Sequence, residues 1–85
     1  MPYIPHEERE PFGTPARRLG VAAVTVGQLN FNITSMILSF LGPHPHYRDF
    51  NEAIGALECI KQELYRRMVA PYEDMKIKEN GDVYS

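Results

Sequence analysis

The residues best suited to chemistry lie towards the end of the chain, where tyrosines alternate with basic side chains. Arginine forks and lysine ammonium groups bind phosphates, and tyrosine rings stack on bases or sugars. This combination predicts a surface for an anionic, nucleotide-like ligand or for a partner protein. The expected ligand-binding residues are Glu58, Lys61, Tyr65, Arg66, Arg67, Tyr72, Lys76, Lys78 and Tyr84.

The same residues also fit a simpler interpretation, a solvated surface whose tyrosines pack on a neighbouring helix. Lys61 is the least ordinary of them, because on a helical wheel it lies between Phe50 and Ile54, inside an apolar face. A lysine whose stem follows the apolar surface to a carboxylate at Glu58 explains this position without a ligand. In the functional interpretation, Glu58, Lys61 and Tyr65 line a pocket.

Acidic and histidine side chains define a second hypothesis, a small metal-dependent hydrolase that uses Glu73, Asp74, Asp82 and the loop histidines His44 and His46. The His-x-His pair supplies two ligands, and no third follows at a recognised spacing. A catalytic site needs a nucleophile, a base or a metal with supporting groups. We therefore expect a non-catalytic protein with no cofactor or metal, and we keep the hydrolase as the alternative.

A long helix must position most of these side chains. Asp49 and Glu52 form a capping box that opens it, and we expect it to span residues 50–69 and to end because Pro71 follows. Pro71 then opens a short helix through Lys78, which Asn80 and Gly81 end. The expected buried face of the long helix is Phe50, Ala53, Ile54, Leu57, Ile60, Leu64 and Met68.

Another helix is predicted over residues 25–41. Thr25 and Gln28 form a capping box, and Gly42 followed by Pro43 is a stop signal. Its first apolar face is Leu29, Ile33, Met36, Ile37 and Phe40, at helical spacing. Phe31 and Leu38 form a second face on the opposite side. In a chain this small, a second copy is the simplest cover for that second face, so we expect a homo-oligomer with Phe31 and Leu38 at the interface.

Residues 1–13 look like an extended, proline-rich arm, with one helical turn after Pro5. Thr14 and Pro15 then predict a helix that reaches Val24. Residues 14–85 are expected to form a single small domain. The predicted fold is all-α, a hairpin or bundle of two to four helices with a short C-terminal helix and tail.

The composition narrows the setting. The 85 residues carry a net charge of −2, which does not favour duplex DNA as a partner. Residues 19–47 hold no Asp, Glu, Lys or Arg, but their Asn, Ser and Thr favour a helix covered by protein over a membrane span. One cysteine and no signal peptide indicate the cytoplasm.

Four segments resemble a family of short uncharacterised proteins found in bacteria, archaea and tailed phages. They begin at Ile54-Gly55-Ala56-Leu57-Glu58-Cys59-Ile60-Lys61 and continue with Glu63-Leu64-Tyr65-Arg66-Arg67, Pro71-Tyr72-Glu73-Asp74 and Glu79-Asn80-Gly81-Asp82-Val83-Tyr84. The chain departs from the family between Pro11 and Gly27, where the family has a longer charged helix. The resemblance implies a small cytoplasmic or phage-encoded helical protein and no established activity. In a phage, a sponge for a nucleotide signal or an inhibitor of a host protein would be concrete versions of the binding function.

Overall fold

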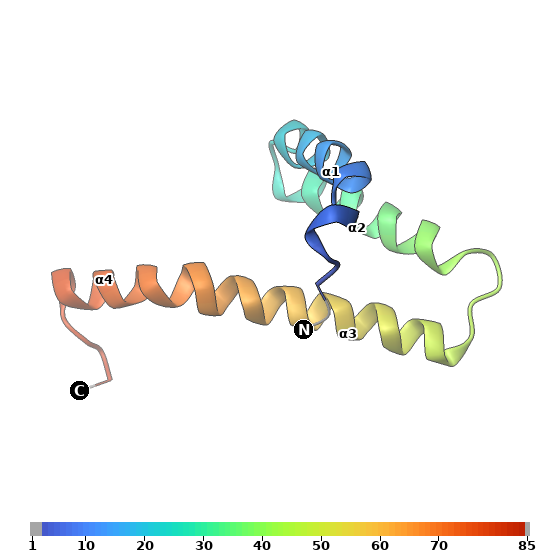
Figure 1. Ribbon diagram of the computed structural model, residues 1–85. Coiled ribbons are helices and arrows are strands. Elements are labelled where there is room, and N and C mark those ends of the chain that lie inside the picture. Colours follow the sequence, from blue (N-terminus) through green and yellow to red (C-terminus); the bar gives the residue numbers. More distant parts are fainter. Residues whose placement is uncertain (1–2, 85) are drawn as a thin grey trace. The chain divides into compact units, whose positions relative to one another are not determined.

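A computed structural model describes residues 3–84 of the chain, and these residues form helices and no strands (Figure 1). The all-α prediction is therefore confirmed. The elements in chain order are a 3₁₀ turn η1 (His6–Glu8), α1 (Glu10–Ala22), α2 (Val26–Leu41), α3 (Tyr47–Leu64), a π turn η2 (Tyr65–Val69) and α4 (Ala70–Asn80).

The chain divides into two units, an N-terminal unit that ends at Asp49 and a C-terminal unit that begins at Phe50. The N-terminal unit contains η1, α1, α2 and the start of α3. The C-terminal unit contains the rest of α3, η2, α4 and the tail.

The predicted turn after Pro5 is confirmed by η1, in which the Glu8 amide donates to the Pro5 carbonyl at 2.9 Å. The predicted helix start at Thr14 is wrong. Helix α1 already begins at Glu10, because the Arg9 carbonyl accepts the amides of Phe12 and Gly13 at 3.1 and 2.9 Å. Pro15 lies inside this helix instead of opening it.

Helix α2 begins and ends at the predicted residues. The Thr25 hydroxyl accepts the Gln28 amide at 3.1 Å, and the Gln28 side chain accepts the Thr25 amide at 3.1 Å. This reciprocal pair is the predicted capping box. At the other end, Gly42 adopts a φ of 73° and its amide donates to the Leu38 carbonyl at 3.1 Å. A positive φ suits glycine, which has no Cβ.

Helix α1 is tied to α2 by a hydrogen bond from the Asn32 amide nitrogen Nδ2 to the Leu19 carbonyl, 3.2 Å long. On a helical wheel Asn32 lies between the two apolar faces of α2. Because α1 is bonded to α2 between the two faces, side chains on both faces stay exposed. Phe31 and Leu38, which form the second face, are 70% and 63% exposed.

Helix α3 begins earlier than predicted, at Tyr47, and the capping residues were misplaced. The Asp49 carboxylate accepts the amide of His46 at 2.8 Å, so Asp49 lies inside the first turn and reaches back to the residue before the helix. The predicted box had used Asp49 as the cap itself. An acidic side chain in the first turn also suits the positive end of the helix dipole.

The helix does not end before Pro71, which corrects a second prediction. Helices α3 and α4 are joined through η2, and Figure 1 shows one uninterrupted helical ribbon from α3 to α4. Pro71 has no N–H and its ring crowds the carbonyl four residues earlier. The π turn relieves this conflict because the Ala70 amide donates to the Tyr65 carbonyl, five residues back. The helical run from Tyr47 to Asn80 is therefore about 50 Å long, at ~1.5 Å per residue.

The predicted buried face of the long helix is largely exposed. Ala53, at 5% exposure, is the one buried residue among those described. Phe50, Ile54, Ile60, Leu64 and Met68 are exposed and Leu57 is half-buried. The reason is that the C-terminal unit consists of one helical run and a tail, which contain no second helix to cover the face.

Within residues 3–84, none of the helices combines the length and apolar character that crossing a membrane requires.

Candidate functional site

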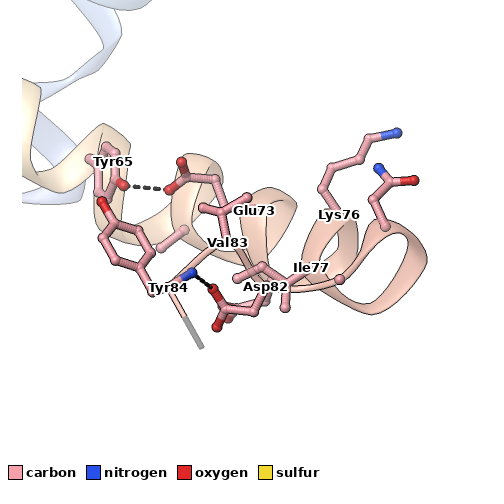
Figure 2. Close-up of a pocket in the computed structure, with 11 residues that line it drawn as sticks. Tyr65, Glu73, Lys76, Ile77, Asp82, Val83 and Tyr84 are labelled. Carbon is pink, nitrogen blue, oxygen red and sulfur yellow. Dashed lines mark hydrogen bonds between the residues drawn. The ribbon is translucent and has the colours of Figure 1, made fainter.

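A hollow in the C-terminal unit lies between α4 and the tail that follows it (Figure 2). Its volume is about 610 Å³, and it opens to solvent. Helix α4 forms one wall, the tail forms the other, and Tyr65 from η2 stands at one end. The lining residues are Tyr65, Ala70, Glu73, Asp74, Lys76, Ile77, Asn80, Gly81, Asp82, Val83 and Tyr84.

A hydrogen bond fixes one end of the hollow: the Tyr65 hydroxyl donates to the Glu73 carboxylate (Figure 2). This bond, together with the negative charge of Glu73, raises the pKa of the Tyr65 hydroxyl above its ordinary value of 10.0. Loss of the phenolic proton would break the bond and place two negative charges side by side. Tyr65 therefore acts here as a neutral donor.

The tail wall is built by the end of α4. Gly81 has a φ of 88°, and its amide donates to the Ile77 carbonyl at 2.8 Å. The Asp82 carboxylate then accepts the Tyr84 amide at 2.8 Å, which turns the tail. Tyr84 is nevertheless 97% exposed, so its ring borders the hollow without packing against α4.

The charges around the hollow do not favour an anion. Glu73, Asp74 and Asp82 contribute three carboxylates, against the single ammonium of Lys76. The Lys76 ammonium lies 3.3 Å from Glu79 and 5.5 Å from the centre of the Tyr72 ring. Figure 2 shows the Lys76 side chain extending away from the two tyrosine rings.

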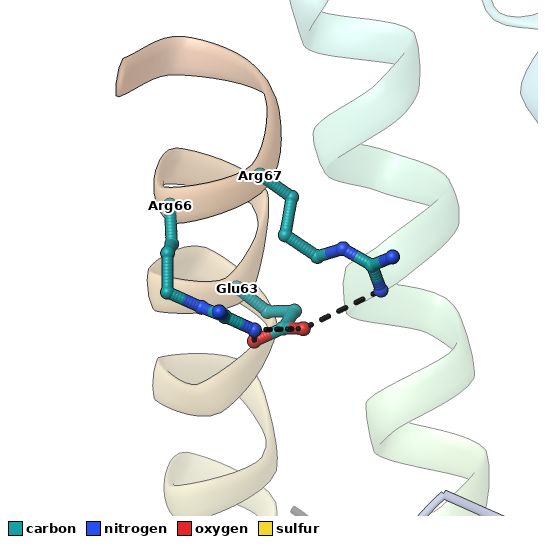
Figure 3. Close-up of polar contacts among 3 residues, drawn as sticks. All are labelled: Glu63, Arg66 and Arg67. Atoms are coloured by element: carbon teal, nitrogen blue, oxygen red, sulfur yellow. Dashed lines mark hydrogen bonds and ion pairs between the residues drawn. The ribbon is translucent and has the colours of Figure 1, made fainter. Parts of the chain in front are cut away.

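Arg66 and Arg67 do not line the hollow, because both turn to Glu63 (Figure 3). Arg66 Nη2 donates to both Glu63 oxygens, at 2.9 and 3.0 Å. Arg67 Nη1 lies 3.6 Å from the same carboxylate. Exposed ion pairs of this kind contribute little stability, about 0.2–1 kcal/mol. They do occupy the guanidinium groups that an anionic ligand would need.

Glu58 and Lys61 form a separate pair on α3, with Lys61 Nζ 3.3 Å from Glu58 Oε1. Gln62 Nε2 donates to the same oxygen at 3.1 Å. The Gln62 hydrogen bond and then the Lys61 ammonium lower the pKa of the Glu58 carboxyl from its ordinary value of 4.5. The predicted pairing of Lys61 with Glu58 is therefore present, and both side chains are exposed. Tyr65, the third member of the expected trio, turns to Glu73 instead.

The carboxylates that the hydrolase hypothesis needs make separate contacts. Glu73 accepts from Tyr65, and Asp82 turns the tail. Over the described part of the chain, no three His, Cys, Asp or Glu side chains are grouped to hold a metal ion. His44 and His46 belong to the N-terminal unit, before α3.

Of the nine expected ligand-binding residues, the structure brings Tyr65, Lys76 and Tyr84 to the hollow. Glu58, Lys61, Arg66, Arg67, Tyr72 and Lys78 lie outside it. The sequence reasoning missed Ala70, Ile77, Asn80, Gly81 and Val83 as lining residues. One signal was available for them, since Asn80-Gly81 marks a reversal that returns the tail beside α4.

These helices and this hollow define a small all-α protein. Within that class, the chain belongs to the family described as a domain of unknown function, DUF6899, which matches residues 1–83. The membership confirms the resemblance to an uncharacterised family. No curated protein and no solved structure matches the chain.

Proposed function

We propose that this chain is a non-catalytic helical binding protein that works as a homo-oligomer and captures a partner protein through its C-terminal unit. The exposure of nearly every large apolar side chain in residues 3–84 carries the proposal. Large contiguous apolar surfaces on soluble proteins usually mark sites of association.

Helix α2 supports self-association most directly, because it has two apolar faces. The first face is Leu29, Ile33, Met36, Ile37 and Phe40, and the second is Phe31 and Leu38. Within the N-terminal unit the second face is exposed, and another copy of the chain can cover it.

The contacts of the basic residues support a protein as the captured partner. A nucleotide would have to draw Arg66 and Arg67 away from Glu63 and enter a hollow with an excess of carboxylates. A protein can instead use the exposed Tyr72, Met75 and Tyr84 side chains. A small phage-encoded inhibitor of a host protein is one concrete version of this function.

Light scattering on the purified protein tests the oligomer. We expect a mass above that of one 9.7 kDa chain, and we expect Phe31→Ser with Leu38→Ser to lower it. Val21→Ser is the matched control, because Val21 is 85% exposed on α1 and lies on neither face of α2. A clean monomer in the wild type would refute self-association.

Partner capture needs a separate measurement. We expect the wild type to retain one protein from a cell extract at a fixed stoichiometry. The variant with Tyr72→Ser and Met75→Ser should no longer retain that protein, and the Val21→Ser control should. Calorimetric titration with a panel of nucleotides tests the competing ligand class. Nucleotide binding that disappears with Arg66→Ala and Arg67→Ala would replace the protein partner by an anionic ligand.

A further inference from the structure

A stripe of side chains along the C-terminal unit follows the spacing of a coiled coil. Successive members are separated by four, three, four, three and four residues, which is the pattern of alternating d and a positions in a heptad. The stripe consists of one lysine among apolar residues: Phe50, Ile54, Leu57, Lys61 and Leu64 on α3, and Met68 at its end in the π turn η2. Ile54 and Met68 are 65% and 66% exposed, so the stripe has no cover within its own unit.

We propose that this stripe is a docking surface for the same stripe of a second copy, with the two helices antiparallel. The proposal rests on the self-association proposed above and specifies one of its contacts. In antiparallel coiled coils an a residue of one helix lies beside a d residue of the other. The stripe then forms layers of Phe50 with Met68 of the second copy, Ile54 with Leu64, and Leu57 with Lys61.

Lys61 decides the orientation. In a parallel pair in register, the two Lys61 ammonium groups would face one another at an a position, and like charges repel. In the antiparallel pair each Lys61 lies beside Leu57 of the second copy, one residue from that copy's Glu58. The Lys61 ammonium is already directed along the edge of the stripe, 3.3 Å from its own Glu58. A polar residue at a single a position is a known device for setting register.

The same lysine favours a second copy over α2 as the occupant. Residues 19–47 contain no Asp, Glu, Lys or Arg, so α2 has no carboxylate to offer across the stripe. A second copy presents Glu58 on each side of the pair, which makes the charges of the two stripes complementary. The Lys61 side chain is 73% exposed and already pairs with its own Glu58, and a second copy adds another Glu58 beside it where α2 would add no carboxylate.

The proposed register also leaves the candidate site free. Its outermost layer joins Phe50 to Met68 of the second copy, so α4 and the tail extend beyond the paired stripes. The hollow and the exposed Tyr72 and Met75 would remain available to a partner protein.

Cysteine cross-linking tests the register and the orientation together. The variants carry Cys59→Ser, which removes the one native thiol from the side of α3 opposite the stripe. Ile54→Cys and Leu64→Cys chains are purified separately, mixed while reduced, and then oxidised. We expect a mixed disulfide between the two chains and little disulfide within either pure sample. Disulfide formation requires Cα atoms closer than about 7 Å.

Two controls make the result specific. Glu52→Cys mixed with Arg66→Cys has the same sum of residue numbers but lies on the outer face of the helix, and we expect no cross-link. Phe50→Cys mixed with Met68→Cys repeats the test in another layer, so that one poorly folded variant does not decide the outcome. Circular dichroism and light scattering of the reduced variants establish that helix content and mass match the wild type.

The possible results separate this inference from the proposed function. A disulfide between two Ile54→Cys chains would indicate parallel pairing and overturn the proposal. An oligomeric protein with no mixed disulfide in either layer would overturn the stripe pairing and leave self-association through α2 standing. A monomeric wild type would overturn both.

Discussion

The Tyr65 hydroxyl donates a hydrogen bond to the Glu73 carboxylate across the π turn that accommodates Pro71. The two residues are eight positions apart and belong to η2 and α4. The bond therefore links the segments on either side of Pro71 by a side-chain contact. It is also the contact that holds one end of the hollow, which makes it a sensitive reporter for the C-terminal unit.

The first prediction concerns the Tyr65 pKa. Because the Glu73 hydrogen bond raises it above 10.0, Glu73→Ala should return it towards the ordinary value. Glu73→Gln retains an acceptor but removes the charge, and should give an intermediate pKa. The measurement is the ultraviolet titration of tyrosinate, with Tyr65→Phe subtracted to isolate this residue. Identical titrations for all three Glu73 forms would contradict the assigned contact.

The same contact predicts an alkaline dependence of stability. The pKa of Tyr65 is higher in the folded state than in the unfolded state. The contribution of its hydrogen bond to the free energy of unfolding is therefore fully present below pH 10.0 and is lost as the pH rises through the raised pKa. In urea unfolding, the free energy of unfolding of the wild type should fall more over this pH range than that of the Tyr65→Phe variant. Equal slopes for the two proteins in that pH range would count against it.

The π turn gives a second prediction. Pro71→Ala restores an N–H and removes the ring that crowds the preceding turn, so η2 should relax to a regular α-helix. Because the π turn already accommodates the ring, we expect stability to rise by less than the ~3 kcal/mol that a proline inside a regular helix costs. Hydrogen exchange should show greater protection of amides 65–71, and unchanged protection would mean that the turn does not depend on proline.

The third prediction is an acidic dependence at Glu58. The pKa of Glu58 is lowered first by Gln62 and then by Lys61, so its contribution is present above pH 4.5 and is lost as the pH falls through the lowered pKa. In a carboxyl titration by NMR, Gln62→Ala and Lys61→Gln should each raise the Glu58 pKa. An unchanged Glu58 pKa in either variant would contradict the assigned cause.

The fourth prediction is that alanine has opposite effects on stability at Gly42 and at Gly55. Gly42 has a φ of 73° and a ψ of −172°, which alanine adopts only with strain. Gly42→Ala should therefore cost about 1–3 kcal/mol. Gly55 lies inside α3, where an added Cβ meets no atom within 4 Å. Gly55→Ala should stabilise by about 0.5–1 kcal/mol, since glycine in a helix loses more chain entropy than alanine. Urea unfolding of both variants checks the signs.

Local signals in the sequence were sufficient for much of the N-terminal unit. Thr25 and Gln28 cap α2 as predicted, and Gly42 ends it, because caps and stops depend on side chains within four residues of one another. Helix α1 was placed too late because Thr14 and Pro15 imitate a start signal, while the carbonyl that opens the helix belongs to Arg9.

The sequence by itself determined that the chain is all-α, where α2 begins and ends, and which side chains could form an apolar stripe. Only the three-dimensional structure decided that the helix passes Pro71, because a π turn depends on backbone bonds that no residue pattern here announced. It also decided the partners of the charged groups. Arg66 and Arg67 both turn to Glu63, and Tyr65 donates to Glu73, although the residue spacing alone left these side chains available to a ligand.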